Sequence, residues 1–355
     1  MKYSDFLDNQ VYLFTEEKTV QESEAQMIKD ICGSLKTPIN CFNLSIIDSN
    51  YDYDTYYFED EETSYCIKIS LDSNCFFLKN EIKNLKKINE LIRPKYIADG
   101  IHNISSEILY LITSYEHAIP LKGNFDKYQS FDFDSLFDSY LLFQESKKIK
   151  NSQKNYYLNF LKHHNIKKIF PDYAVDYIDS DENKKQIIKI ISEIKFELKT
   201  LSESFIDDEK FNCHGGLSLS TIIERDGCFK FINFDHSFSG HCFFDLADMI
   251  IELRIPQEKD FFVLKKFCEK MNIEYDKRSI EIYEKCYDIC LRKKIINVSF
   301  CYLAEIFIFE SERKQKIYNL CSRFSGFFDR FLKIDIFKEN KDYIYKIITE
   351  PIFNK

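Results

Sequence analysis

The spacing of hydrophobic and polar residues changes character along the chain. Short segments rich in β-branched and aromatic residues, typical of strands, lie at 42–47, 55–58, 65–69 and 108–114. Apolar residues at intervals of three and four predict helices at 21–31, 78–91, 133–141, 187–205, 243–253, 261–271, 280–290, 298–309, 318–332 and 343–348. The pattern predicts an α+β chain with a small β-rich lobe over residues 1–117 and a large helical lobe over residues 118–355.

A hairpin is predicted near residue 226. Two short apolar runs, 221–223 and 229–232, flank an Asp226-Gly227 pair. Asp-Gly between strand-forming residues is a strong signal for a tight turn. Polar loops precede and follow the hairpin, and loops held by a rigid hairpin are common places for catalytic side chains. We therefore expect the chemistry of this chain between residues 211 and 247.

Composition narrows the class of protein. The chain has 355 residues, 45% of them hydrophobic, which is enough for a substantial core. The net charge of −9 and the lack of a basic stripe argue against a nucleic-acid partner. No apolar run reaches the membrane-spanning length of about 18 residues, and the first residues lack the apolar core of a signal peptide. We expect a cytoplasmic protein whose 12 cysteines are reduced and mostly buried.

The segment 211–247 resembles the catalytic core of the aminoglycoside phosphotransferase and choline kinase family, whose fold is that of protein kinases. His214-Gly215 and, beyond the hairpin, Asp245-Leu246-Ala247 match the family's residues. The resemblance implies a bilobal protein-kinase-like fold and an ATP-dependent transfer of phosphate to an alcohol group. It also implies that His214 and Asp245 are structural residues that brace the catalytic loop.

Three positions depart from the family's pattern. Gly216 stands where the family has its catalytic Asp, Thr221 where it has a metal-binding Asn, and Asn233 where it has a metal-binding Asp. Glycine cannot supply a general base, a loss that typically costs about 10²–10⁴-fold in rate. Thr221 and Asn233 offer Mg²⁺ only neutral oxygens. Asp235 matches the family's second acidic position, and we weigh two roles for it: a metal ligand, or a brace for the following loop.

The family likeness extends into the β-rich lobe. Lys68, in the strand at 65–69, matches the lysine that binds the α- and β-phosphates of ATP, and Glu81 matches the helix glutamate that pairs with it. Ser114 and Glu116 fall where the family's hinge meets the adenine. The alternative for Lys68 and Glu81 is an ordinary surface lysine and a solvated helix glutamate.

The loop at 48–54 differs from a usual nucleotide loop. It reads Asp-Ser-Asn-Tyr-Asp-Tyr-Asp, without a glycine. A phosphate loop needs close approach of backbone N–H groups, which glycine permits, and the three aspartates would repel a polyphosphate. We therefore expect this loop to weaken the binding of ATP, and the neutral oxygens of Thr221 and Asn233 to weaken that of Mg²⁺.

Two other chemistries are considered. His236, His241 and Cys242 lie close in sequence, but their spacing fits no standard zinc site. Cys213 precedes His214, and adjacent residues on an extended segment point to opposite sides, which is a poor arrangement for a Cys-His nucleophile.

Three hypotheses for function follow. The first is a pseudokinase, a phosphotransferase fold kept as a binding or interaction module for an unknown small molecule or protein. The second is an active small-molecule kinase that uses Asp235 for metal and a base from elsewhere, with an aminoglycoside, choline or sugar-like acceptor. The third is a structural subunit of a larger assembly.

Overall fold

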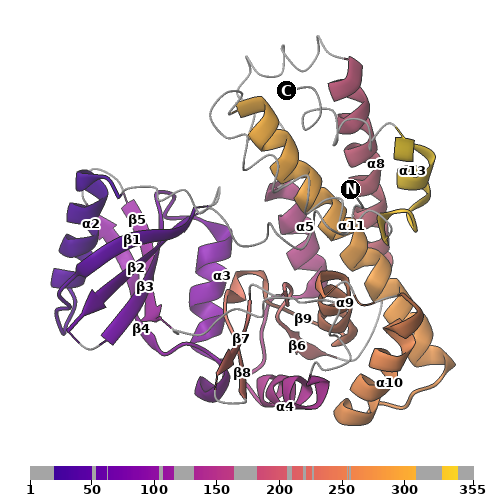
Figure 1. The fold of residues 1–355 in the computed structure, drawn as a ribbon, viewed down its shortest axis with the longest axis horizontal. Helices are drawn as coiled ribbons and strands as arrows, with labels where there is room; N and C mark the ends of the chain where they lie inside the picture. Colours follow the sequence, from indigo (N-terminus) through magenta and orange to yellow (C-terminus); the bar gives the residue numbers. More distant parts are fainter. Residues whose placement is uncertain are drawn as a thin grey trace, which may run out of the picture.

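The chain folds into a β-sheet part and a helical part that lie against each other (Figure 1). In this computed structural model the described residues are 20–49, 53–61, 63–103, 107–115, 132–163, 182–205, 210–218, 221–225, 228–253, 255, 257–308 and 330–342. The predicted α+β class and the predicted bilobal arrangement are both confirmed.

The first part is an antiparallel sheet of five strands in the order β1-β2-β3-β5-β4. Its strands are β1 (Phe42–Ser49), β2 (Asp54–Asp60), β3 (Thr63–Ser70), β4 (Tyr96–Asn103) and β5 (Glu107–Ser114). The four predicted strands are present. The edge strand β4 was not predicted, because its residues Asp99, Gly100 and Asn103 disfavour strands on propensity. Pairing with β5 over its whole length holds it in the sheet.

A helix covers each face of this sheet, and the alternation of β3 decides which side chains meet which helix. Ile67 and Ile69 point to one face, where they pack in a buried cluster with α2 (Glu22–Gly33). Lys68 points to the other face, toward α3 (Phe76–Leu85). Helix α3 lies between the sheet and the helical part (Figure 1) and contacts the short 3₁₀ helix η3 (Phe234–His236).

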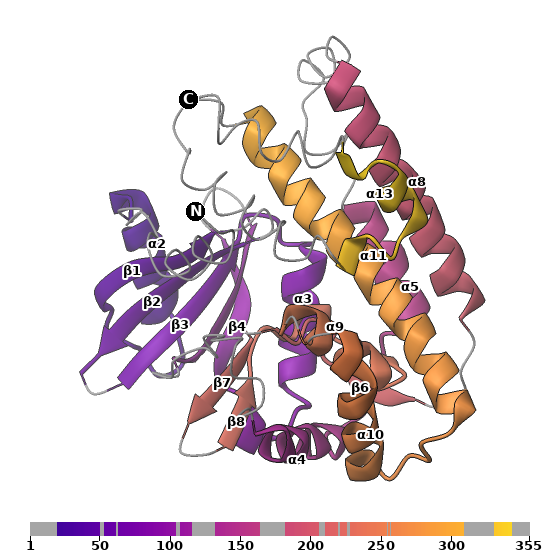
Figure 2. The ribbon, with the colours of Figure 1, turned by 45° about the vertical axis from the view of Figure 1, so that its right-hand side comes forward.

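The helical part is built around two long helices, α8 (Glu182–Ser204) and α11 (Lys277–Ile308), which run side by side in both views (Figure 2). Its other elements are α4 (Phe133–Gln144), α5 (Gln153–His163), α9 (Phe243–Glu252), α10 (Asp260–Met271) and α13 (Asp335–Glu339), with 3₁₀ turns η1 (Glu90–Ile92) and η4 (Gln257–Lys259). The prediction of two helices at 280–290 and 298–309 was wrong. The polar residues between them include no helix breaker, so one helix continues through.

Two short pairs of strands carry the central motif. Strand β6 (Phe211–Cys213) pairs with β9 (Phe238–Gly240), and β7 (Ile222–Arg225) pairs with β8 (Cys228–Phe231). Arg225 lies opposite Cys228, so the predicted hairpin is present, although the Asp226-Gly227 pair itself lies outside the described residues. Both pairs pack into the same buried cluster as α3, α4 and α9.

Some predictions fall where the structure is not described. The boundary at residues 117 and 118 lies there, as do Glu116, the helix at 343–348 and most of the helix at 318–332. These stay predictions. Within the described part of the chain, no helix combines the length and the apolar character needed to cross a bilayer.

Candidate functional site

The loop that follows β6 is held by one buried carboxylate, Asp245 of α9. Its Oδ2 accepts hydrogen bonds from the His214 backbone N–H (2.6 Å) and the Tyr140 hydroxyl (2.9 Å). Its Oδ1 accepts one from the Gly215 N–H (2.8 Å). Burial raises the pKa of Asp245 to about 7, and these three donors oppose the rise. Asp245 is fully buried, and its contacts are those of a residue that positions the loop.

His214 ties the same loop to the segment after β8. Its Nε2 lies 2.9 Å from the Ile232 carbonyl oxygen, which can only accept, so Nε2 carries the proton. Its Nδ1 has no hydrogen-bond partner within the described chain. Burial lowers the pKa of His214 to about 3, so the ring is neutral at physiological pH. A buried, neutral ring that donates to backbone is a scaffold group.

Gly216, the position of the missing carboxylate, lies beside the ring of His236. A Cβ added at Gly216 would lie 3.8 Å from His236 Cδ2, an ordinary contact distance. The His236 Nδ1 is 3.0 Å from the Tyr156 hydroxyl, and its Nε2 is 3.8 Å from Asp235 Oδ2. The group nearest the missing side chain is therefore an imidazole that itself neighbours a carboxylate.

Thr221, the second altered position, uses its hydroxyl within its own loop. Oγ1 donates to the Gly216 carbonyl oxygen at 2.9 Å and accepts from the Ser218 N–H at 2.8 Å. The residue is only 8% exposed. A hydroxyl engaged in this way stabilises the loop and has little capacity left to bind a metal ion.

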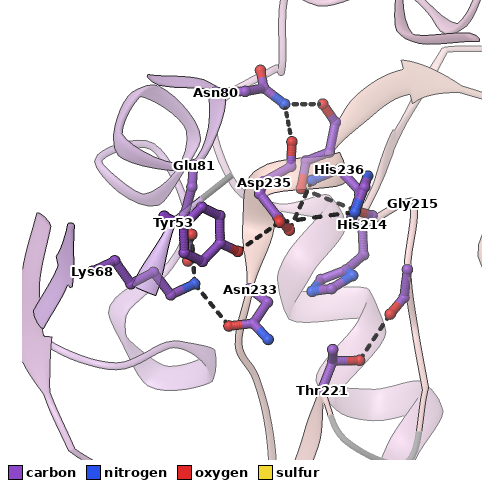
Figure 3. A network of polar contacts seen from close by, with 12 residues as sticks. Tyr53, Lys68, Asn80, Glu81, His214, Gly215, Thr221, Asn233, Asp235 and His236 are labelled. Carbon is purple, nitrogen blue, oxygen red and sulfur yellow. Dashed lines mark hydrogen bonds and ion pairs between the residues drawn. The ribbon is translucent and has the colours of Figure 1, made fainter. Parts of the chain in front are cut away.

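Lys68 joins the two parts of the molecule, as Figure 3 shows. Its Nζ lies 2.6 Å from Glu81 Oε2 on α3 and 2.8 Å from Asn233 Oδ1, which precedes η3. Burial alone would lower the pKa of Lys68, but the carboxylates of Glu81 and Asp235 outweigh burial, and its pKa is raised. The Lys68 ammonium therefore contacts both Glu81, its predicted partner, and Asn233, the third altered position.

Asp235 faces these groups from the other side. Its Oδ2 accepts a hydrogen bond from the Tyr53 hydroxyl at 2.8 Å, and its Oδ1 accepts one from the His236 N–H at 3.1 Å. Its carbonyl oxygen accepts from Asn80 Nδ2 at 2.7 Å, and the same amide group donates to the Ser237 carbonyl at 3.0 Å. The amide of Asn80 thus fixes η3 against α3 (Figure 3).

A buried ion pair between α9 and α11 also supports the loop that follows β6. Lys293 of α11 lies 2.6 Å from Asp248 Oδ2 of α9 and donates to the Gly215 carbonyl oxygen at 2.7 Å. Burial would lower the pKa of Lys293, but Asp248 raises it well above its ordinary value. The loop is therefore held by α9 through Asp245 and by α11 through Lys293.

These residues fit a phosphate group better than a magnesium ion. Lys68 is a charged ammonium of the kind that binds phosphate oxygens. Magnesium prefers near-octahedral oxygen ligands with carboxylates among them. Here Asn233 gives its amide oxygen to Lys68, and Asp235 already accepts two hydrogen bonds. Across the described ranges, no group of three or more His, Cys, Asp and Glu side chains is arranged to hold a metal ion.

The remaining predicted residues are placed as follows. Ser114 ends β5, where its Oγ accepts a hydrogen bond from the Lys95 N–H at 2.8 Å. Glu116 lies outside the described residues. The Cys213 thiol donates to the His241 carbonyl oxygen at 3.2 Å, whereas the His214 ring bonds to Ile232. The Cys213 thiol and the His214 imidazole therefore have different partners.

Sequence reasoning missed four contributors to the site: Asn80, Lys293, Asp248 and Tyr53. Asn80 carried a signal, because it and Asn84 are polar positions on the buried side of a helix whose other buried residues, apart from Glu81, are apolar. Asp248 sits among apolar helix positions, which hinted at burial, whereas Lys293 lies in the polar stretch 292–294 of α11. Neither residue indicated its partner. Tyr53 gave no readable signal, since an aromatic residue in an acidic loop is equally compatible with exposure.

Comparison with solved structures finds a similar fold in small-molecule kinases. A choline kinase from Streptococcus pneumoniae is 14% identical, with a TM-score of 0.52 over 86% of this chain and 99% of that chain. A spectinomycin phosphotransferase solved with ADP and spectinomycin is 12% identical, with a TM-score of 0.51 over 86% and 94%. An amicoumacin kinase solved with AMP-PNP and Ca²⁺ is 12% identical, with a TM-score of 0.55 over 86% and 96%.

Sequence comparison adds nothing to this: the chain matches no protein-family model, and a search of curated proteins gives no significant match. At these identities, the similarity to solved structures establishes the fold alone. The chain therefore has the bilobal, protein-kinase-like fold of choline kinases and aminoglycoside phosphotransferases, which confirms the resemblance seen in its sequence.

Proposed function

We propose that this chain is a pseudokinase, a phosphotransferase-fold protein that acts as a binding or interaction module and transfers phosphate poorly or not at all. The observation that carries the proposal is the use made of the three altered positions. Gly216 presents no side chain, the Thr221 hydroxyl bonds within its loop, and the Asn233 amide bonds to Lys68. The position of the base therefore has no side chain, and the side chains at the two metal-ligand positions are engaged in hydrogen bonds within the protein.

The frame around these positions supports retained binding. The Lys68–Glu81 pair is formed, Asp245 and His214 hold the loop, and Asn80 docks α3 on η3. Structural relatives were solved with ADP and with AMP-PNP. ATP, bound with little help from Mg²⁺, is the ligand that this site favours.

Turnover measurements test the proposal. ATP consumption with Mg²⁺, with choline or spectinomycin as acceptor, is compared between the natural chain, Lys68→Ala and a Gly216→Asp/Asn233→Asp double variant. We expect the natural chain to match Lys68→Ala, and the double variant to exceed both by about 10²-fold or more, because it regains a base and a charged metal ligand. Robust turnover by the natural chain, at a rate close to that of the double variant and abolished by Lys68→Ala, would overturn the pseudokinase assignment.

A matched control separates the base from a change in bulk. Gly216→Asn/Asn233→Asp has a side chain of nearly the same size at residue 216 but lacks the carboxylate. A Cβ is tolerated at Gly216, so both double variants are expected to fold. Equal rates for the two double variants would contradict the assignment of Gly216 as the vacant base position.

A second candidate function is an active small-molecule kinase with a relocated base. The observation in its favour is His236, which lies beside Gly216, is partly exposed and has Asp235 at 3.8 Å. In this alternative the His236 imidazole accepts the acceptor's proton and Asp235 takes the metal. His236→Ala and Asp235→Ala should then each abolish turnover, and an unchanged rate in either variant rules this alternative out.

A further inference from the structure

Tyr53 holds an unusual place for a residue of the small lobe. It directly precedes β2, at the end of the stretch where the family's phosphate-covering loop is expected, and it is only 7% exposed. Its side chain packs with α3 and η3 in the large interlobe cluster, whereas Tyr56 and Phe58 of β2 pack in the separate cluster under α2. Tyr53 therefore reaches inward, between the two parts of the molecule (Figure 3).

The contacts of Tyr53 are with the two charged groups that a nucleotide complex would need. Its hydroxyl donates to Asp235 Oδ2 at 2.8 Å, and the centroid of its ring lies 5.0 Å from Lys68 Nζ. A hydrogen bond to a carboxylate is among the stronger ones in proteins, and an ammonium near an aromatic face is stabilised by the ring. The Tyr53 side chain thus stabilises the Asp235 carboxylate with its hydroxyl and the Lys68 ammonium with its ring.

These contacts leave little surface for a ligand. Lys68 is 6% exposed and Asp235 is 7% exposed. Of the three N–H donors of Lys68, two point to Glu81 and Asn233, and the Tyr53 ring covers the same ammonium. A phosphate group must approach Lys68, and a metal ion must approach the carboxylate of Asp235. Either approach displaces Tyr53.

We propose that Tyr53 is a built-in occupant of the phosphate side of the interlobe site, which must leave before a polyphosphate or a metal ion can bind between Lys68 and Asp235. The inference goes beyond the proposed function, because it holds whether or not the protein turns over ATP. Its consequence is quantitative. The apparent affinity for ATP equals the affinity of the open site multiplied by the fraction of molecules in which Tyr53 has left the site.

The experiment measures ATP affinity by titration calorimetry, with Mg²⁺ and with EDTA, in the natural chain, Tyr53→Phe and Tyr53→Ala. Tyr53→Phe keeps the ring and loses only the hydrogen bond to Asp235. We expect ATP to bind Tyr53→Ala at least about tenfold more tightly than the natural chain, and Tyr53→Phe to lie between them. Adding Lys68→Ala to Tyr53→Ala should remove the gain, since the ligand then lacks the ammonium that Tyr53 had covered.

Tyr96 supplies a matched control. It lies on the edge strand β4, its hydroxyl bonds to Asp99, and its ring lies 5.1 Å from Lys86 Nζ, the same pair of contacts made with other partners. Tyr96→Ala should leave ATP affinity unchanged, and an equal gain in both alanine variants would show general loosening and overturn the proposal. Unchanged affinity in both Tyr53→Ala and Tyr53→Phe, each shown to be folded by circular dichroism, would also overturn it.

The outcome separates this inference from the proposed function. ATP turnover that appears in Tyr53→Ala and disappears with Lys68→Ala would overturn the pseudokinase assignment and leave the role of Tyr53 standing. A Tyr53→Ala variant that gains no affinity would overturn the role of Tyr53 and leave the pseudokinase assignment untouched.

Discussion

Two adjacent glycines in the loop after β6 meet different physical demands. Gly215 has a φ of +78°, a conformation that side chains rarely adopt, and a Cβ there would lie 2.2 Å from the His236 carbonyl oxygen. At Gly216, the nearest atom that a Cβ would meet is 3.8 Å away. The backbone conformation therefore requires glycine at residue 215, whereas at residue 216 the backbone would accept a side chain.

The contrast predicts unequal effects of the same substitution. Gly215→Ala should lower the free energy of unfolding by about 3 kcal/mol or more, because it combines left-handed strain with a backbone clash. Gly216→Ala should change it by less than about 1 kcal/mol. Urea unfolding followed by circular dichroism measures both. Similar losses for the two variants would contradict the geometry described for this loop.

His214 makes stability depend on pH in a predictable direction. Its pKa is about 3 in the native state against an ordinary 6.5, so below pH 6.5 the unfolded chain binds a proton that the native ring does not. Stability from this residue is complete above pH 6.5 and is lost as the pH falls, by about 1.4 kcal/mol per unit.

The variant His214→Gln keeps a donor for the Ile232 carbonyl but does not titrate. The natural chain should therefore lose about 2 kcal/mol relative to His214→Gln between about pH 7.5 and pH 5. Unfolding curves of both proteins across this range give the difference directly. A difference that does not vary with pH would show that the His214 ring is not held neutral.

The sequence was sufficient to predict which residues occupy this site but not all of the contacts that they make. Gly216, Thr221 and Asn233 could be placed because they fall at fixed offsets from His214 and Asp245 in a recognisable frame. The occupation of the site by Tyr53 could not be predicted, since the hydrogen bond to Asp235 joins residues 182 positions apart. Such a contact depends on the three-dimensional arrangement of two lobes and has no local pattern.

Helices α9 and α11 meet around a polar pair in an apolar surrounding. Lys293 and Asp248 are 9% and 7% exposed, and Lys293 also holds the Gly215 carbonyl. A buried ion pair contributes little over apolar residues of similar shape, but removal of one partner leaves an uncompensated charge. The contact between α9 and α11 is therefore weakened when only one of Lys293 and Asp248 is present.

Lys293→Met should lower the free energy of unfolding by about 3–5 kcal/mol, whereas Lys293→Met/Asp248→Leu should recover part of that loss. Lys277 and Glu281 on the same helix form an exposed pair for comparison, with side chains 92% and 56% exposed. Lys277→Met should cost less than about 1 kcal/mol. A loss of stability in the double variant that equals the sum of the losses in Lys293→Met and in Asp248→Leu would refute the coupling.

Element boundaries were predicted well where one face is apolar and poorly where burial is mixed. Helix α10 (Asp260–Met271) and the strands of the sheet interior followed from periodicity. Helix α5 (Gln153–His163) was missed because its polar residues dilute the apolar face made by Tyr156, Tyr157 and Phe160. The continuous α11 was missed because its polar middle, Arg292 to Lys294, is paired with partners on α8 and α9 that the sequence does not reveal.

At the scale of the whole molecule, the two parts share one core and the small lobe keeps a second. The larger cluster contains Phe77, Leu78 and Leu85 of α3 together with Phe234 and many residues of the helical part. The smaller cluster joins α2 to the outer face of the sheet. Helix α3 is therefore structurally a member of the large lobe's core, although it lies within the β-rich part of the sequence.

This division predicts how the native state opens. The backbone amides of α3 should exchange hydrogen with the same free energy as those of α9, while the amides of α2 should exchange through a smaller, separate opening. Ile28→Ala and Leu78→Ala test the division, since each truncates a fully buried side chain of one cluster and each should cost about 2–5 kcal/mol locally. Ile28→Ala should speed exchange in α2 and leave α9 protected, whereas Leu78→Ala should speed exchange in α3 and α9 together. Protection of α9 that is unchanged in Leu78→Ala would mean that the lobes open independently, and the hydrogen bonds of Lys68 and Asn80 across the site would then be too weak to couple them.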